Sequence, residues 1–241
     1  MIDWLLKRDH AAPQVEVAGR VLPLVLRRNA AARRMTMRLA PDGSEVRITL
    51  PQWGRTAEAL EFAQKRHGWL AGQLAALPEP AKLSADGLLP YRGDQLPIRH
   101  DPAAPRKVWL SEGELLVGGP AESLQTRLRR WLEGEARRLL SDDLAFYCLR
   151  ADQPAPRLML SNAQRRWGSC ARDGTIRINW RLVMAPDMVR RSVVAHEVAH
   201  LVHFDHSPAF HAMLGQVFEH DIRAANRWLK REGRGLYATL G

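Results

Sequence analysis

The sequence predicts an α+β protein, with an antiparallel, β-rich region and one helix over residues 1–120 and a mixed helical and β core over residues 121–241. Three observations support this fold class. Residues 15–50 alternate apolar and polar positions in short runs, as half-buried strands do. Residues 122–149 carry leucines at helical spacing. A later segment with helical apolar spacing contains the pattern His-Glu-x-x-His, and the two regions could pack as one compact unit.

The N-terminal region contains a series of predicted strands followed by one predicted helix. Residues 41–44, Pro-Asp-Gly-Ser, are a turn signal between the last two strands and predict a hairpin. Apolar residues then recur at helical spacing from Thr56 to Leu74, and the segment Pro78-Glu79-Pro80 should end that helix. The strands are expected at residues 15–17, 22–27, 35–39 and 46–50.

Residues 81–120 are interrupted by prolines and glycines, with short apolar runs between them, such as residues 107–110 and 114–117. We therefore expect a second small set of antiparallel strands here. An amphipathic helix should follow from about Glu122 to Leu149, with leucines facing inward and arginines facing outward.

The C-terminal core should contain another β segment, over residues 157–184, and then further helices. Its strand candidates are residues 158–160 and 175–180, and Asp173-Gly174 is a turn signal between them. The helix signals that follow are Pro186-Asp187 as a start, Ser207-Pro208 as a start, Asp221 as a cap, and Gly233 with Gly235 as an end.

Composition indicates a soluble globular protein. Of 241 residues, 46% are hydrophobic and 26% are charged, and no apolar run is long enough to span a membrane. The first ten residues lack the apolar segment and cleavage site of a secretory signal, so we expect a cytoplasmic protein without a membrane partner. Cys148 and Cys170 form no Cys-x-x-Cys metal motif and are expected to be reduced packing residues.

The net charge of +10 concerns possible partners rather than the fold. Arginine pairs recur along most of the chain, which is typical of solvated surfaces. A positive surface of this kind could also attract nucleic acid, nucleotides or acidic protein segments. We find no helix-turn-helix, zinc-finger or aromatic RNA-binding signature that would favour nucleic acid.

The pattern formed by His196, Glu197 and His200 is the most informative feature of the chain. Histidines four residues apart on a helix lie on one face, one turn apart, so their imidazoles can converge on a single zinc ion. The glutamate between them is placed to reach a water molecule on that ion. The sequence thus favours a hydrolytic metalloenzyme with one catalytic Zn²⁺.

A catalytic zinc site of this kind needs a third protein ligand from another direction. His203 lies seven residues from His196, about 10.5 Å along a continuous helix, which suits a tetrahedral ion poorly. The Ser207-Pro208 start signal predicts a turn at about Phe204 to Asp205, which would fold His206 back over the metal. His206 is therefore the favoured third ligand. The remaining candidates are Asp205, His211 and Glu219.

The chemistry predicted from these residues is hydrolysis by an activated water. Glu197 would act as the general base and return the proton to the leaving group. A donor is also needed for the developing oxyanion, and Arg166, His203 and His211 are polar candidates on the substrate side. Cys170 as a catalytic thiol is a weaker alternative beside this metal site.

Several segments together resemble the YgjP-like metallopeptidase-domain family, predicted zinc-dependent hydrolases of bacteria and archaea related to SprT-like and zincin-type peptidases. They are Arg166-Trp167-Gly168-Ser169-Cys170, Ile178-Asn179-Trp180-Arg181-Leu182, His196-Glu197-Val198-Ala199-His200 and Asp205-His206-Ser207-Pro208-Ala209-Phe210. The resemblance extends over most of the chain and implies a zincin-like core, zinc on His196, His200 and His206, and Glu197 as the base. Position 211 is usually aromatic in this pattern, so His211 departs from it.

In the segment around Trp167, we expect a strand and turn beside the metal helix. Trp167 should be a core residue, and Gly168 should allow a close backbone approach; contact of this segment with the substrate is the alternative.

Four functions compete on this basis. A zinc peptidase acting on peptides or proteins is favoured by the zincin-like spacing. The alternatives are a metal-dependent nucleotide phosphohydrolase (pyrophosphatase) with arginines as phosphate clamps, a DNA-associated SprT-like protease supported by the net charge, and a structural zinc module. The free glutamate and the lack of a fourth strong ligand argue against the structural module.

Overall fold

The computed structural model describes residues 13–77 and 84–240 and confirms an α+β protein. The chain forms two compact units, Met1–Pro78 and Glu79–Gly241, each built around its own hydrophobic core. The boundary between the two units thus falls after residue 78. The sequence pattern instead groups residues 1–120 with the N-terminal region. Two predictions fall outside the described residues. They are the absence of a secretory signal in the first ten residues and the end of the helix at Pro78-Glu79-Pro80.

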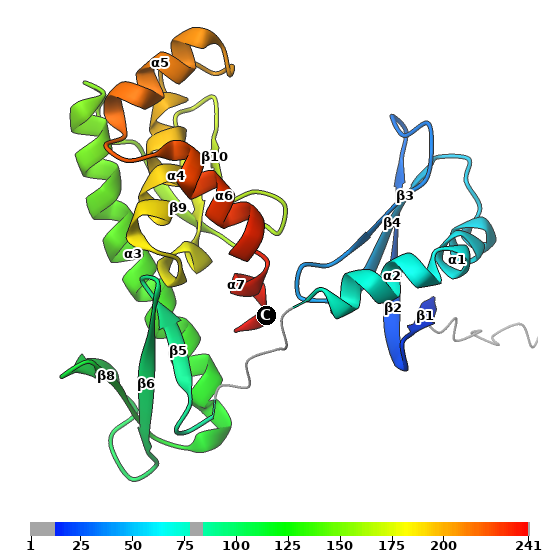
Figure 1. Ribbon diagram of the computed structural model, residues 1–241, viewed down its shortest axis with the longest axis horizontal. Helices are drawn as coiled ribbons and strands as arrows, with labels where there is room; N and C mark the ends of the chain where they lie inside the picture. Colours follow the sequence, from blue (N-terminus) through cyan, green and yellow to red (C-terminus); the bar gives the residue numbers. More distant parts are fainter. Residues whose placement is uncertain (1–12, 78–83, 241) are drawn as a thin grey trace, which may run out of the picture. The chain divides into compact units, whose positions relative to one another are not determined.

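The N-terminal unit contains a four-stranded sheet (Figure 1). The strands are β1 (Gln14–Val17), β2 (Arg20–Asn29), β3 (Thr36–Leu39) and β4 (Val46–Pro51). Their order in the sheet is β1-β2-β4-β3, and the predicted β3–β4 hairpin is present. The expectation of a purely antiparallel sheet is wrong, because β2 and β4 pair in parallel. The hairpin docks with β4 inward, which buries the apolar side chains of that central strand.

Two helices cover one face of this sheet, where the sequence predicted one (Figure 1). They are α1 (Thr56–Lys65) and α2 (His67–Ala75), and they are separated at Arg66, whose φ of −105° and ψ of 17° leave the helical region. Ala59 and Ala63 of α1 and Leu70 and Leu74 of α2 are buried against the sheet. The predicted helical segment, Thr56 to Leu74, thus matches the combined extent of α1 and α2, but the helix is interrupted at Arg66.

A second sheet opens the C-terminal unit. Its strands are β5 (Leu88–Tyr91), β6 (Asp94–Asp101), β7 (Val108–Ser111) and β8 (Glu114–Gly118), in the order β5-β6-β8-β7. β6 and β8 pair in parallel, so this sheet is not purely antiparallel either. Its apolar side chains share one core with the first turns of the following helix, and the backbone amides of Arg92 and Gly93 donate to the carbonyls of Val183 and Met184. These contacts explain why residues 84–120 belong to the C-terminal unit.

A long helix and a three-stranded sheet form the rest of the C-terminal unit. The helix α3 (Leu124–Arg150) follows the short 3-10 turn η1 (Ala121–Ser123) and matches the predicted amphipathic helix. The sheet, in the order β10-β11-β9, contains β9 (Leu158–Ser161), β10 (Gly168–Cys170) and β11 (Ile176–Asn179). The edge strand β10 pairs antiparallel with β11, which pairs in parallel with β9.

The last helices begin and end close to their predicted signals. After the 3-10 turn η2 (Trp180–Met184) come α4 (Asp187–Ala199), α5 (Pro208–Val217), α6 (Ile222–Glu232) and α7 (Gly235–Ala238). The Ser207 side chain accepts a hydrogen bond from the Phe210 amide, and Asp221 accepts one from the Arg223 amide, so both predicted caps are present. Within the described parts of the chain, no helix has the length and apolar character needed to cross a membrane.

Candidate metal site

The end of α4 carries the His-Glu-x-x-His pattern. His196 and Glu197 lie in its last turn, and His200 is the C-terminal cap. The sequence placed the turn at about Phe204 to Asp205, but the helix already ends at Ala199 and the chain turns from His200 onward. This earlier turn gives the connection enough length to bring His206 back toward the helix.

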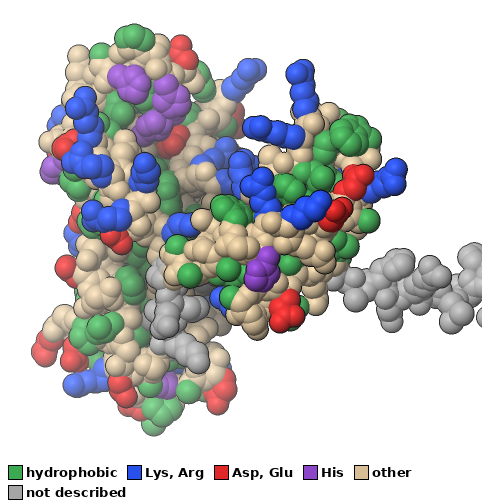
Figure 2. Space-filling model, turned by 45° about the vertical axis from the view of Figure 1, so that its right-hand side comes forward, with side chains coloured by type: hydrophobic (Ala, Val, Ile, Leu, Met, Phe, Trp, Pro, Cys, Tyr) green, Lys and Arg blue, Asp and Glu red, His purple; other side chains and the backbone are tan. Residues whose placement is uncertain are grey.

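His196, His200 and His206 bring their side chains together, and their ring nitrogens lie within 4.8 Å of one another. The Nε2 atoms of His196 and His206 are 3.2 Å apart. In a tetrahedral zinc site with Zn–N distances of about 2.05 Å, two nitrogen ligands lie about 3.3 Å apart. The His196–His206 pair therefore has the spacing of two ligands of one metal ion, and the third nitrogen lies close enough for the three histidines to form a candidate metal site. Figure 2 shows histidine side chains gathered at the surface near α5.

The ring of Phe210 packs against the imidazole rings of all three histidines. Its ring centroid lies 4.9 Å from that of His196, 4.5 Å from that of His200 and 4.9 Å from that of His206. The ring is fully buried, and the Ser207 cap fixes the first turn of the helix that carries it. The sequence motifs do not predict this role. The sequence signal for it is an aromatic residue three positions after a Ser-Pro helix start that directly follows a ligand.

Hydrogen bonding at His200 and burial at His196 favour the metal-binding form of these two imidazoles. Nδ1 of His200 lies 2.9 Å from the backbone carbonyl oxygen of His203, which can only accept, so this nitrogen donates and leaves Nε2 with a lone pair. Burial, with smaller effects of His200, His206 and His211, lowers the pKa of His196 to about 4. His196 is then neutral at physiological pH, as a metal ligand must be.

Glu197 lies beside the histidine cluster and is only 5% exposed. Burial raises the pKa of its carboxyl to about 7, against the opposing effects of a hydrogen bond from the Cys170 backbone and the positive charge of Arg166. A carboxyl group with this pKa exchanges protons readily near neutrality, which is the property required of a general base. Arg166 itself is exposed.

Gly168 of the edge strand β10 makes room for Glu197. A Cβ atom at this position would lie 2.4 Å from Oε1 of Glu197, 2.7 Å from its Cγ and 2.8 Å from its Cδ. Only a residue without a side chain allows this approach. The neighbouring Trp167 packs against the core, with its ring centroid 5.4 Å from that of Tyr237. The predicted packing roles of Trp167 and Gly168 are confirmed, and the partner of Gly168 is the candidate base itself.

Among the described residues, the other ligand candidates lie outside the histidine cluster. The carboxylate of Glu219 accepts a hydrogen bond from the Tyr147 hydroxyl and forms an ion pair with Arg191 at 2.6 Å. Asp205 accepts a hydrogen bond from the Ser207 amide within the turn. The ring centroid of the exposed His211 lies 6.4 Å from that of His206.

His203 and Cys170 lie close to the site, and Cys170 is a free cysteine packed against the core, as expected. His203 contributes its backbone carbonyl to the site, through the hydrogen bond with His200. Burial, together with the charges of Glu197 and Asp173, raises the pKa of the Cys170 thiol, so a reactive thiolate there is disfavoured.

The family relationship follows from a comparison that extends across both units. A model of the YgjP-like family, described as a metallopeptidase domain, matches residues 33–232 of the 241. The chain belongs to the YgjP-like family. A YgjP-like protein is a metal-dependent hydrolase by its family's description, and the convergent histidines suit that assignment. No curated protein and no solved structure matches the chain.

Proposed function

We propose that this chain is a zinc-dependent metallopeptidase with a zincin-like core, which hydrolyses peptide bonds with Glu197 as the general base. The observation that carries the proposal is the convergence of three imidazoles beside a buried, uncoordinated carboxyl group. A structural zinc site would be closed by a fourth protein ligand, whereas this cluster offers three among the described residues. The two free cysteines suit the reducing cytoplasm that we expect as its location.

His196, His200 and His206 would hold the metal, and three convergent imidazole nitrogens are a ligand set that suits Zn²⁺. A bound zinc ion would supply Lewis acidity, which lowers the pKa of water and polarises a carbonyl oxygen. Phe210 holds the imidazole rings in place from the core side. The His203 carbonyl fixes the ring orientation of His200.

Glu197 would move the proton. With a pKa of about 7, one carboxylate oxygen accepts a proton from the attacking water and later donates it to the departing amine. The Cys170 amide and Gly168 hold this carboxyl group in position from the side of β10. The guanidinium of Arg166 is near enough to influence Glu197 and is the favoured donor toward the developing oxyanion or the substrate.

An activity screen tests the proposal. The zinc-loaded protein is assayed against a quenched-fluorescence peptide library, a basic protein with and without DNA, and nucleoside triphosphates, with Glu197→Gln as the matched blank. We expect peptide hydrolysis that Glu197→Gln lacks. Release of phosphate or pyrophosphate without peptide cleavage would replace the peptidase assignment by a nucleotide phosphohydrolase. DNA-dependent cleavage of the basic protein would assign the DNA-associated activity instead.

A further inference from the structure

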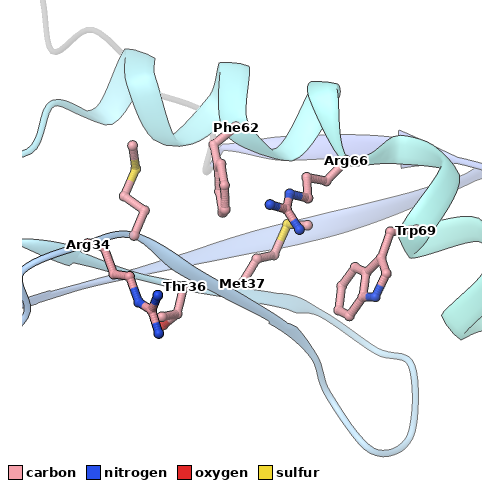
Figure 3. A pocket seen from close by; sticks show the side chains of 7 residues that line it. Arg34, Thr36, Met37, Phe62, Arg66 and Trp69 are labelled. Atoms are coloured by element: carbon pink, nitrogen blue, oxygen red, sulfur yellow. The ribbon is translucent and has the colours of Figure 1, made fainter.

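A groove at one edge of the N-terminal unit has no role in the site described above. It encloses a cavity of about 270 Å³ between strand β3 and the helices α1 and α2 (Figure 3). Met35 and Met37 line it on the strand side, and Phe62 and Trp69 line it on the helix side. Arg34 and Arg66 stand at its rim. We call this cavity the β3 groove.

The β3 groove runs along a free strand edge. β3 is the outermost strand of its sheet and, among the described residues, pairs only with β4. The backbone N–H and C=O groups on its other edge are thus left without a neighbouring strand. Such an edge can pair with an extended peptide, while pockets beside the strand select alternate side chains.

The rim of the β3 groove is positively charged. No carboxylate lines it, and Arg34 and Arg66 form no ion pair with any described residue. The guanidinium of Arg66 lies over the Phe62 ring, 5.3 Å from its centroid, which positions the cation at the apolar wall. Residues 13–77 contain ten Lys and Arg residues against five Asp and Glu residues. Figure 2 shows Lys and Arg side chains projecting from the surface.

The opposite edge of the same sheet provides a contrast. A cavity of about 330 Å³ lies between β1 and the same two helices, lined by residues that include Glu16, Gln64 and His67. It contains a carboxylate, no arginine, no methionine, and no phenylalanine, tyrosine or tryptophan. Positive charge combined with methionine and aromatic side chains is thus a property of the β3 groove and not of every open edge of this sheet.

We propose that the β3 groove binds an extended, acidic peptide segment that adds as a strand to β3 and inserts an apolar side chain between Met37, Phe62 and Trp69. Methionine side chains adapt to different apolar groups, which suits a site that accepts varied sequences. Arg34 and Arg66 pair with the acidic residues of the segment. The β3 groove is then a substrate-recognition site apart from the metal, and this identification of the peptide as substrate rests on the proposed function.

Two other occupants fit less well. A second copy of this chain would bring a net charge of +10 against another cationic edge. A single-stranded nucleic acid would need exposed aromatic faces on which to stack. Trp69 is 43% exposed, but Phe62 is partly buried and lies beneath the Arg66 guanidinium.

Direct binding to the full chain tests this proposal without depending on catalysis. The Glu197→Gln protein is titrated with a fluorescein-labelled peptide, Asp-Glu-Leu-Phe-Val-Asp-Glu, and with the same peptide carrying Lys in place of each acidic residue. The double variant Arg34→Glu/Arg66→Glu is compared with Arg20→Glu, an exposed arginine of β2 outside the groove. We expect the acidic peptide to bind, and the double variant to lose at least about tenfold in affinity. Arg20→Glu should change it less than about twofold.

Hydrogen exchange of backbone amides distinguishes strand addition from general charge attraction. We expect the acidic peptide to slow exchange in residues 35–39 and the Lys peptide to have no effect. Equal affinity of the double variant and Arg20→Glu, or unchanged exchange in β3, would overturn the proposal. Displacement of the peptide by oligothymidylate at lower concentration, or dimerisation through β3, would assign the groove to nucleic acid or to a second copy. Failure of peptide hydrolysis with binding intact would overturn only the proposed function.

Discussion

The contact between Gly168 and Glu197 makes a sharp prediction for Gly168→Ala. The new Cβ would lie 2.4 Å from Oε1 of Glu197, and real Cβ atoms essentially never approach closer than 3.0 Å. The backbone at Gly168 is not left-handed, so alanine itself is not strained there. The carboxyl oxygen must therefore move by about 0.6 Å to reach this limit and by about 1 Å to reach ordinary van der Waals contact at 3.4 Å. A displacement of about 1 Å near reacting atoms lowers kcat about 100-fold. Crowding should reduce the free energy of unfolding by about 1–3 kcal/mol.

The assay combines peptide hydrolysis, zinc affinity and urea unfolding on the same preparations. We expect zinc affinity near that of the wild type, because the three histidines do not contact Gly168 in any described interaction. Gly215→Ala is the matched control, since a Cβ there meets nothing within 4 Å. It should keep full activity and gain up to about 1 kcal/mol in stability, because Gly215 lies within α5. Undiminished kcat in Gly168→Ala would refute the positioning role of Gly168.

Three further predictions follow from the site. In metal-free protein, the pKa of Glu197 is raised from 4.5 to about 7, so the folded state loses stability as pH rises through this window. Glu197→Gln should therefore be no more stable than wild type below pH 4.5 and up to about 3 kcal/mol more stable at pH 8. Urea unfolding at a series of pH values measures this difference. The same pH dependence of the free energy of unfolding in both proteins would count against a buried carboxyl group. Phe210→Ala should reduce stability by about 3–5 kcal/mol and also weaken zinc binding, whereas unchanged zinc affinity would show that the ring does not support the ligands. Chelation with EDTA should abolish hydrolysis and lower Tm, and added zinc should restore both; hydrolysis that persists after complete chelation would exclude the metal.

Local patterns were sufficient to predict many elements of the fold. The turn at residues 41–44 gave the β3–β4 hairpin, and the leucine spacing gave α3 to within a few residues. The Ser207 and Asp221 caps were predicted because a capping side chain acts on amides two or three residues away. These features depend on neighbours in the sequence, which a single chain displays directly.

Strand pairing and the division into units could not be predicted in the same way. The parallel pairs β2–β4 and β6–β8 join segments separated by another strand, and nothing in the alternation of either segment specifies a parallel partner. The unit boundary depends on hydrogen bonds from Arg92 and Gly93 to η2, which link residues about 90 positions apart. For such long-range contacts, the sequence alone offers no local signal.

The candidate site shows the same distinction. His196, Glu197 and His200 follow from helical spacing, and the helix start at Ser207 predicted that the chain would return His206 to them. The fit of Gly168 against Glu197 is a tertiary contact, so the sequence indicated a close approach at that glycine but not its partner.

Zinc affinity across a set of single variants tests the central claim most directly. The claim is that His196, His200 and His206 bind one zinc ion while Glu197 remains free for proton transfer. Competition with a chromogenic chelator gives the zinc Kd of wild type, His206→Ala, Glu219→Ala and Glu197→Gln. We predict one zinc per chain, a loss of more than about 100-fold in affinity for His206→Ala and near wild-type affinity for the other two. Wild-type affinity in His206→Ala, or its loss in Glu219→Ala, would contradict the assignment.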